Sequence, residues 1–343
     1  MACTCFIIPE DVLGRFANDK SLSALERNGF KNALALEPYW RQIRSLQSEL
    51  TGVAAMSLAG PAAVAPSPAI NVNNCNHTTT LPGTPVANPG ASGDATAKRA
   101  FVETTQVAKF YKTVFGRNSV DNQGMTLGSS IHYGVNYNNA FWNGTRMTYG
   151  DGDGNIFVDF TKGNDVIGHE LTHGVTQHSA QFDYANQAGG LNESMSDVFG
   201  SMFRQWEAGQ DVAHADWLIG HDIMGPGAIK RGFTCLRDMA NPAAAHCLAP
   251  QPTNFSAYHD GMDPHHSSGI PNFAFYKAAM AIGGKSWEKT GQIWYRALTG
   301  FAPSPNMKMI DFANRTRSLA QSMYPKIPAI KAAVNAAWNA VGL

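Results

Sequence analysis

The stretch "VIGHELTHGVTQ", residues 166–177, carries two histidines four residues apart, with a glutamate directly after the first. On an α-helix, residues four apart lie on one face, so His169 and His173 can direct both imidazoles at one ion while Glu170 lies beside them. Catalytic zinc requires this geometry, with protein ligands on one side and a water on the other. The motif alone is only suggestive, because this spacing arises by chance in roughly one chain in a hundred.

A second run, "GGLNESMSD" at residues 189–197, supplies what the first lacks. Glu193 can complete a set of three metal ligands with His169 and His173, which leaves one position of a tetrahedral zinc open. Asp197 lies one helical turn after Glu193 on the same face, where it can accept a hydrogen bond from a ligating imidazole and fix its tautomer. Asn192, in the same run, is expected to support the ligands in a similar way. Together the two runs predict one zinc ion.

The overall composition argues against two classes of partner. The chain has 343 residues, 44% of them hydrophobic, and its 26 Lys and Arg residues balance 26 Asp and Glu residues. This length suits two ordinary domains, and the lack of a net basic field argues against nucleic acid or an anionic membrane as a partner. The first residues, "MACTCFIIPEDVLGRF", show no cationic leader followed by an apolar run. We therefore expect a cytoplasmic start, with export by a route that needs no recognisable leader left open.

Local composition divides the chain into four parts. Residues 1–51 hold "PEDVLGRFA" and "PYWRQIRSLQSEL", which predict two short amphipathic helices that each begin at a proline. Residues 52–70 form an Ala-, Pro- and Ser-rich linker open to proteases. Residues 71–182 are rich in turn signals and in alternating apolar and polar residues, which predict strands. One helix that ends at Gly116 interrupts them, and the zinc-binding helix also falls in this part. Helices dominate residues 183–343, in the segments 191–209, 270–284, 286–300 and 325–342.

This order of elements predicts an α+β fold. A β-rich half is followed by a mainly helical half, and the zinc-binding helix lies at their junction. The helices of residues 1–51 are too short to bury their apolar faces alone, so we expect them to dock on the rest of the chain or on a partner.

Five cysteines, at positions 3, 5, 75, 235 and 247, form no closely spaced metal-binding pair. Cys235 and Cys247 are either joined in a disulfide or reduced like the others, as in a cytosol. A thiolate is a good zinc ligand, so Cys3 or Cys5 can also take the open position of the zinc and silence a precursor. We favour the other interpretation, in which the N-terminal helices simply cover the zinc site.

Several of these runs resemble one known family. "GHELTHGVTQ", "GGLNESMSDVFG" and "NYNNAFWNGTRMTYGDGDG" are similar to motifs of the thermolysin family of zinc endopeptidases, and the similarity continues through "GIPNFAFYKAA" to cover roughly residues 75–343. The N-terminal segment with "FIIPEDVL" resembles the compact propeptide of the protealysin-like branch. The resemblance implies a precursor that its own propeptide inhibits and that cuts itself within the linker, before Val53, Met56 or Leu58.

The resemblance also implies roles for individual residues. Zinc is held by His169, His173 and Glu193, and Glu170 is the base that activates water and later protonates the leaving amine. Tyr184 and His265 match groups that stabilise the oxyanion, which agrees with the need for donors around developing negative charge. Asp260 matches the carboxylate that orients this histidine. Three residues match groups that hold the substrate backbone: Asn139, Ala140 and Arg237.

The same resemblance implies a specificity. Six bulky apolar residues match the family's pocket for the side chain just after the cleaved bond: Phe157, Phe160, Val166, Ile219, Ile223 and Leu236. A pocket of this kind predicts cleavage of peptide and protein substrates before Leu, Phe, Ile, Val or Met.

The sequence departs from the family pattern around calcium. Asp165 and Asp216 remain of a paired calcium site, but Arg204, Leu218 and His221 stand where acidic residues are expected. A guanidinium opposes calcium, which needs several oxygen ligands, so we expect at most one calcium ion. The run "DGDGN" at 151–155 resembles the start of a calcium loop but lacks the later glutamate, and we interpret it as a structural turn.

A second departure follows the expected catalytic histidine. In "HHSSG" either His265 or His266 can face the cleft, and the aligned position favours His265.

Two alternative functions stay open at this point. One is a catalytically silent binding or inhibitory protein with the same fold, which the joint presence of Glu170, Tyr184, Arg237 and His265 argues against. The other is a calcium-stabilised adhesion module, which the loss of acidic residues disfavours. Zinc-dependent peptide hydrolysis would distinguish the predicted endopeptidase from both.

Overall fold

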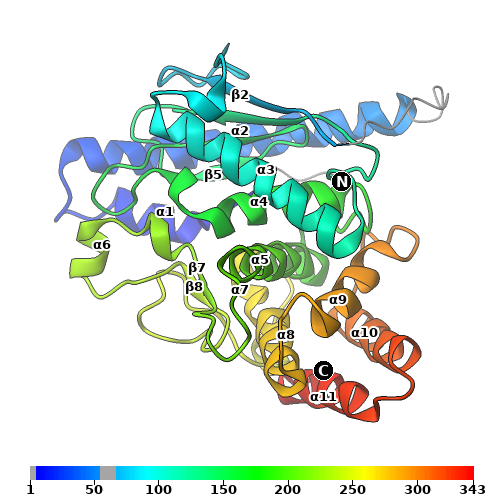
Figure 1. Ribbon diagram of the computed structural model, residues 1–343. Coiled ribbons are helices and arrows are strands. Elements are labelled where there is room, and N and C mark those ends of the chain that lie inside the picture. Colours follow the sequence, from blue (N-terminus) through cyan, green and yellow to red (C-terminus); the bar gives the residue numbers. More distant parts are fainter. Residues whose placement is uncertain (1–4, 55–66) are drawn as a thin grey trace.

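The computed structural model describes residues 5–54 and 67–343 (Figure 1). The strands are β1 (Cys5–Phe6), β2 (Ile70–Asn74), β3 (Thr84–Pro85), β4 (Leu127–Ile131), β5 (Ala140–Trp142), β6 (Arg146–Tyr149), β7 (Leu218–Ile219) and β8 (Arg237–Asp238). The α-helices are α1 (Glu10–Ala17), α2 (Ala24–Ala54), α3 (Ala95–Phe115), α4 (Asn164–Gln177), α5 (Asn186–Ala208), α6 (Pro226–Lys230), α7 (Pro264–Ser267), α8 (Gly269–Ile282), α9 (Lys289–Thr299), α10 (Met309–Met323) and α11 (Pro328–Ala340). Short 3-10 turns lie at η1 (Pro89–Ala91), η2 (Phe160–Lys162), η3 (His221–Ile223) and η4 (Phe255–Ala257).

A mixed sheet forms the first half of the fold. Its strand order is β1-β5-β6-β4-β2-β3, with β4 parallel to both of its neighbours and the other pairs antiparallel. Every residue of β4 is buried, as expected for a central strand covered on both faces. The outermost strand on one side, β1, comes from the N-terminal segment.

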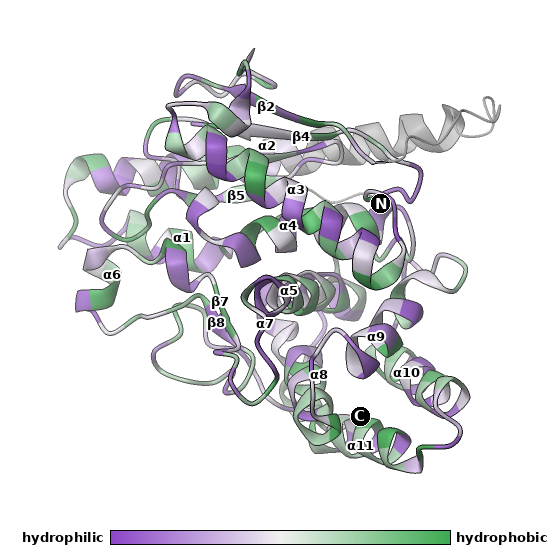
Figure 2. Cartoon of the chain, in the orientation of Figure 1, coloured by the Kyte–Doolittle hydropathy of each residue, from purple (hydrophilic) through white to green (hydrophobic). Residues whose placement is uncertain are grey.

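Helix α3 packs against this sheet and follows the sequence prediction closely. Asp94 caps its first turn by accepting hydrogen bonds from the backbone amides of Thr96 and Ala97. Gly116 ends it in the left-handed region with φ of 69°, the conformation for which glycine is favoured. Its buried residues recur mainly at three- and four-residue spacing, so they share one side of the helix, and that side faces the core. Figure 2 shows hydrophobic and hydrophilic residues interspersed along the ribbon.

Two buried helices, α4 and α5, join the sheet to the helical half, and α4 is the predicted zinc-binding helix (Figure 1). They approach closely because glycines face each other. A Cβ added to Gly168 would lie 3.0 Å from the Cα of Gly200, and one added to Gly200 would lie 2.6 Å from the carbonyl oxygen of Asp165. This contact fixes the distance between the side chains that the two helices present to one another.

The second half is helical, as the sequence predicts, but it contains three more helices than expected: the short α6 and α7, and the longer α10. Helix α10 buries Met309, Phe312, Ala313, Thr316 and Ala320, which have helical spacing, although its surface residues are strongly polar. Among the described residues, no helix has both the length and the apolar character needed to cross a membrane.

The prediction for the second N-terminal helix is wrong about its start. Helix α2 begins at Ala24 and carries Pro38 inside it. A capping box starts it, because the Ser23 amide donates to Glu26 and the Glu26 amide donates to the Ser23 hydroxyl at 3.2 Å. Phe30 and Trp40, on either side of Pro38, are buried against the sheet half, and this packing offsets the hydrogen bond that proline removes.

Candidate active site

The three predicted metal ligands meet between α4 and α5. The Nε2 atoms of His169 and His173 lie 3.0 Å apart, and each lies 3.4 Å from a carboxylate oxygen of Glu193. All three side chains are buried. Two imidazoles and one carboxylate on one side of a point form the ligand set of a catalytic zinc site.

Hydrogen bonds on the far side of each imidazole set its orientation. Nδ1 of His169 lies 2.9 Å from Asp197 Oδ1, and Nδ1 of His173 lies 3.0 Å from Asn192 Oδ1. Because these oxygens accept, the proton of each neutral ring sits on Nδ1 and leaves the Nε2 lone pair directed at the common point.

The polar atoms around this point fit a cation. Two unprotonated nitrogens at 3.0 Å repel each other unless positive charge lies between them. Both oxygens of Glu170 and one oxygen of Glu193 are buried without a hydrogen-bond partner among the described residues. Burial raises the pKa of Glu170 to about 8. The positive charge of a bound zinc ion would balance the imidazole lone pairs and the buried carboxylate oxygens.

His265 and Tyr184 also lie beside the Glu193 carboxylate. The Tyr184 hydroxyl donates to Glu193 and lies 3.2 Å from Nε2 of His265. Nδ1 of His265 lies 2.7 Å from Oδ1 of Asp263. Although burial opposes it, the negative charges of Glu193 and Asp263 raise the pKa of His265 to about 10. These two carboxylates therefore favour the protonated form of His265.

The assignment of Asp260 as the orienting carboxylate is wrong. Asp260 accepts a hydrogen bond from the Tyr258 hydroxyl at 2.9 Å, and Asp263 takes the predicted place beside His265. Asp263 also caps α7 by accepting from the His265 amide at 2.8 Å. One carboxylate thus starts the short helix and orients the histidine two residues later. His266 points elsewhere, with Nε2 3.2 Å from Oδ1 of Asp11.

Arg237 is tied into the ligand network, which the sequence analysis did not foresee. Its guanidinium donates to both oxygens of Asp197, at 2.8 and 2.7 Å, and the pair is fully buried. The side-chain amide of Asn272 donates to the same carboxylate at 2.9 Å. Asn272 lies in "GIPNFAFYKAA", and its place among the residues on the buried face of α8 was the only sequence feature that could have indicated this contact.

The N-terminal segment occupies the predicted substrate groups. The Ile7 amide donates to the carbonyl of Ala140 at 3.1 Å, and the Ile8 amide donates to the side chain of Asn139 at 3.0 Å. Arg237 donates to the Ile7 carbonyl at 3.1 Å.

The preceding residue completes this contact, because the Phe6 carbonyl accepts from Nε2 of His265. Strand β1 runs antiparallel to β5, so these hydrogen bonds extend the edge of the sheet. Cys3 and the side chain of Cys5 lie outside the described part of the chain.

The six predicted pocket residues all enter the core. Each side chain is fully buried, and Phe157 contacts Phe160 with ring centroids 5.5 Å apart. Phe30 of α2 also packs on Phe157, at 6.2 Å. The remaining four are Val166, Ile219, Ile223 and Leu236.

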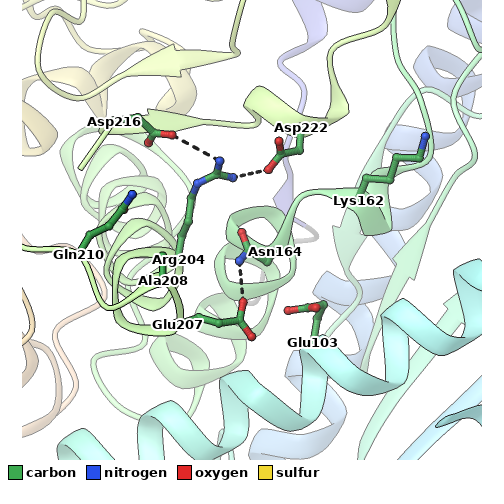
Figure 3. A pocket seen from close by; sticks show the side chains of 9 residues that line it. All are labelled: Glu103, Lys162, Asn164, Arg204, Glu207, Ala208, Gln210, Asp216 and Asp222. Carbon is green, nitrogen blue, oxygen red and sulfur yellow. Dashed lines mark hydrogen bonds and ion pairs between the residues drawn. The ribbon is translucent and has the colours of Figure 1, made fainter. Parts of the chain in front are cut away.

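At the residues predicted for a calcium site, an arginine lies among the carboxylates. Arg204 lies 3.4 Å from Asp216 and donates to Asp222 (Figure 3). It also lies 3.9 Å from Asp165. Its guanidinium supplies the positive charge there.

The run "DGDGN" is a turn, as expected. Oδ1 of Asp153 accepts from the amides of Asn155, Ile156 and Phe157 at 2.8–3.1 Å.

Comparison with known proteins agrees with this geometry. The model of the thermolysin metallopeptidase catalytic domain matches residues 62–177, and that of its alpha-helical domain matches residues 180–343. An extracellular metalloprotease of Pectobacterium carotovorum subsp. carotovorum is 41% identical over 77% of this chain and 78% of its own length.

Protease PrtS of Photorhabdus sp. is 37% identical over 80% of this chain and 76% of its own length. The solved precursor of protealysin from Serratia proteamaculans superposes with a TM-score of 0.83 at 35% identity, covering 98% of this chain and 99% of that one. The chain belongs to the thermolysin family of metallopeptidases.

Proposed function

We propose that the chain is the precursor of a zinc-dependent neutral endopeptidase that cleaves before bulky apolar residues, and that residues 1–51 are its inhibitory propeptide. The observation that carries this proposal is the register of Phe6, Ile7 and Ile8 in the cleft. Their backbone groups engage His265, Ala140, Arg237 and Asn139, the groups expected to hold a substrate. A segment bound in this way excludes substrate by competition.

The Phe6–Ile7 peptide lies where a scissile bond is expected. The Phe6 carbonyl faces His265, and the next carbonyl, that of Ile7, is held by Arg237. Ile7 thus corresponds to the residue after the cleaved bond, and it is a bulky apolar residue. This correspondence supports the predicted preference of the mature enzyme.

The chain's own residues supply most of the chemistry in this proposal. Zinc, held by His169, His173 and Glu193, would act as a Lewis acid and lower the pKa of water. Glu170 accepts the proton of the attacking water and passes it to the leaving amine. Protonated His265 and the Tyr184 hydroxyl donate hydrogen bonds to the oxyanion. Arg237 holds the substrate backbone in register.

Processing within the linker follows from the same proposal. Helix α2 ends at Ala54, and the segment after it leads to β2 at Ile70. Val53 lies in the last turn of α2, whereas Met56 and Leu58 lie outside the described residues. We propose that the precursor starts in the cytoplasm and cuts itself before one of these residues.

An intact-mass time course tests this proposal. Purified wild-type chain should lose about 50 residues, whereas Glu170→Ala and chelator-treated wild type should stay whole. The variant should still bind one zinc, because Glu170 is not a ligand. If all samples stay whole with zinc bound and no added peptide is cut, the alternative of a silent binding or inhibitory protein is correct.

A further inference from the structure

Cys235 and Cys247 lie side by side in a small buried cluster with Ala244. They are paired directly across a parallel bridge. The Thr234 amide donates to the His246 carbonyl at 3.0 Å, and the Leu248 amide donates to the Cys235 carbonyl at 2.9 Å. Both thiols are fully buried, with their sulfurs 3.9 Å apart.

We propose that Cys235 and Cys247 form an intrachain disulfide when the chain folds under oxidising conditions. Residues directly opposite each other in neighbouring strands have Cα atoms about 5 Å apart, inside the range of roughly 4.4–6.8 Å that disulfides require. Rotation of the two side chains then brings the sulfurs together without moving the backbone.

A metal ion is the competing occupant, and the geometry favours it less. His246 is the third potential ligand, because one donor atom from each of these three residues lies within 4.8 Å of the other two. A closed structural zinc site takes four. In addition, Nε2 of His246 already lies 3.2 Å from Asp238.

The bond forms by thiol–disulfide exchange. One of the two cysteines, as its thiolate, attacks one sulfur of a small-molecule disulfide such as oxidised glutathione, and one glutathione thiolate leaves. The other cysteine then loses its proton and attacks the protein sulfur of this mixed disulfide, which closes the Cys235–Cys247 bond and releases the second glutathione as a thiolate. Because both thiols are buried, we expect this exchange during folding.

The bond would brace two functional contacts. Cys235 is followed by Leu236 and by Arg237, the residue that holds the Ile7 carbonyl. On the other side, the Leu248 carbonyl accepts a hydrogen bond from Arg15 of α1 at 2.9 Å. A disulfide would therefore link the segment around Arg237, which binds the Ile7 carbonyl, to the segment around Leu248, which binds Arg15.

Non-reducing peptide mapping tests the proposal without relying on peptidase activity. Glu170→Gln chain, chosen to prevent self-digestion, is refolded with mixed oxidised and reduced glutathione, alkylated and cut with trypsin. Cleavage after Arg231 and Arg237 separates the two cysteines into peptides 232–237 and 238–277. We expect these peptides joined, two hydrogen masses below their sum, and separated by dithiothreitol.

A thermal measurement on the same samples provides the second readout. The oxidised chain should unfold at a midpoint higher than the reduced chain by on the order of 5 °C. This difference should vanish in Cys235→Ser/Cys247→Ser and persist in Cys75→Ser, which removes a buried cysteine elsewhere. Free alkylated thiols at both positions, a link to another cysteine, or a second zinc lost in Cys247→Ser would each overturn the proposal.

Discussion

Two clusters of carboxylates lie along the same helix pair, α4 and α5, and they meet their need for positive charge differently. At the metal centre, His169, His173 and Glu193 converge beside buried oxygens of Glu170 that have no hydrogen-bond partner among the described residues. Near the other ends of the two helices, Arg204 extends from α5 among Asp165, Asp216 and Asp222. The first cluster requires an ion from solution, whereas the second has an internal cation.

This difference predicts that the two clusters respond differently to a chelator. A guanidinium and a calcium ion both neutralise carboxylates, but only the ion leaves with a chelator. Chemistry at the first cluster needs an open coordination position, which no side chain can supply. We therefore expect zinc removal to abolish activity and calcium removal to leave stability unchanged.

Glu170→Gln should produce the largest effect on the metal cluster. The amide keeps the shape of the side chain but cannot accept a proton, so kcat/KM for an apolar peptide should fall by about 10³-fold or more. Zinc content, measured by mass spectrometry of the metal, should stay at one per chain. Loss of zinc together with activity would instead make Glu170 a ligand.

Asp263→Asn should reduce kcat/KM by roughly 10–100-fold in the mature enzyme. The amide still caps α7 but no longer carries the negative charge that favours protonated His265. The upper pKa of the pH profile of kcat/KM should therefore fall. Asp260→Asn is the matched control and should leave both rate and profile near wild type; the opposite ranking would restore the assignment of Asp260.

Arg204→Glu should make the second cluster, like the first, depend on a metal ion from solution. With the guanidinium gone, a fourth carboxylate joins three others, and in calcium-free buffer the free energy of unfolding should fall by about 2–4 kcal/mol. Millimolar calcium should restore much of it. Calorimetry of the variant in a Glu170→Gln background measures both changes.

Arg204→Gln provides the control, because it loses the charge without adding a ligand. It should be destabilised but gain less from calcium. Wild-type chain that is itself stabilised by calcium would show that Arg204 has not replaced the ion.

The sequence predicted the metal ligands well because helical periodicity fixes which residues share a face. His169 and His173 are four residues apart on α4, and Glu193 and Asp197 are four apart on α5, so the spacing alone sets their directions. It failed at Asp263, because Asp260 and Asp263 both precede His265 in an irregular segment where no period operates. The bidentate pairing of Arg237 with Asp197 joins residues 40 positions apart, which only the tertiary fold brings together.

The helix errors have a similar origin. Proline was expected to start the second N-terminal helix, and tertiary packing of Phe30 and Trp40 carries α2 through Pro38 instead. The capping box at Ser23 and Glu26 was a usable local signal that went unused.

A third cluster sharpens the comparison, because its cation can be removed by pH. His132 lies between Asp151, 2.8 Å from Nδ1, and Asp94, 3.0 Å from Nε2, and thereby joins the turn at residues 151–155 to the cap of α3. Its hydrogen bond to Asp151 raises the pKa to about 9, against the opposing effect of burial.

Because the folded pKa is raised, the stabilisation is fully present below the unfolded value of about 6.5 and is lost as the pH rises through about 9. Allowing for solvent screening, we expect the folded state to lose about 1–2 kcal/mol between pH 6 and pH 10 through this group. His132→Asn, which tolerates the left-handed backbone at φ of 52°, should remove that part of the pH dependence. His214→Asn removes an exposed histidine paired with Asp211 and should change it little. Denaturant unfolding of all three chains in the Glu170→Gln background, at pH 6 and pH 10, measures the difference. An unchanged pH dependence in His132→Asn would mean that this cluster, like the one around Arg204, holds its carboxylates without help from a titrating proton.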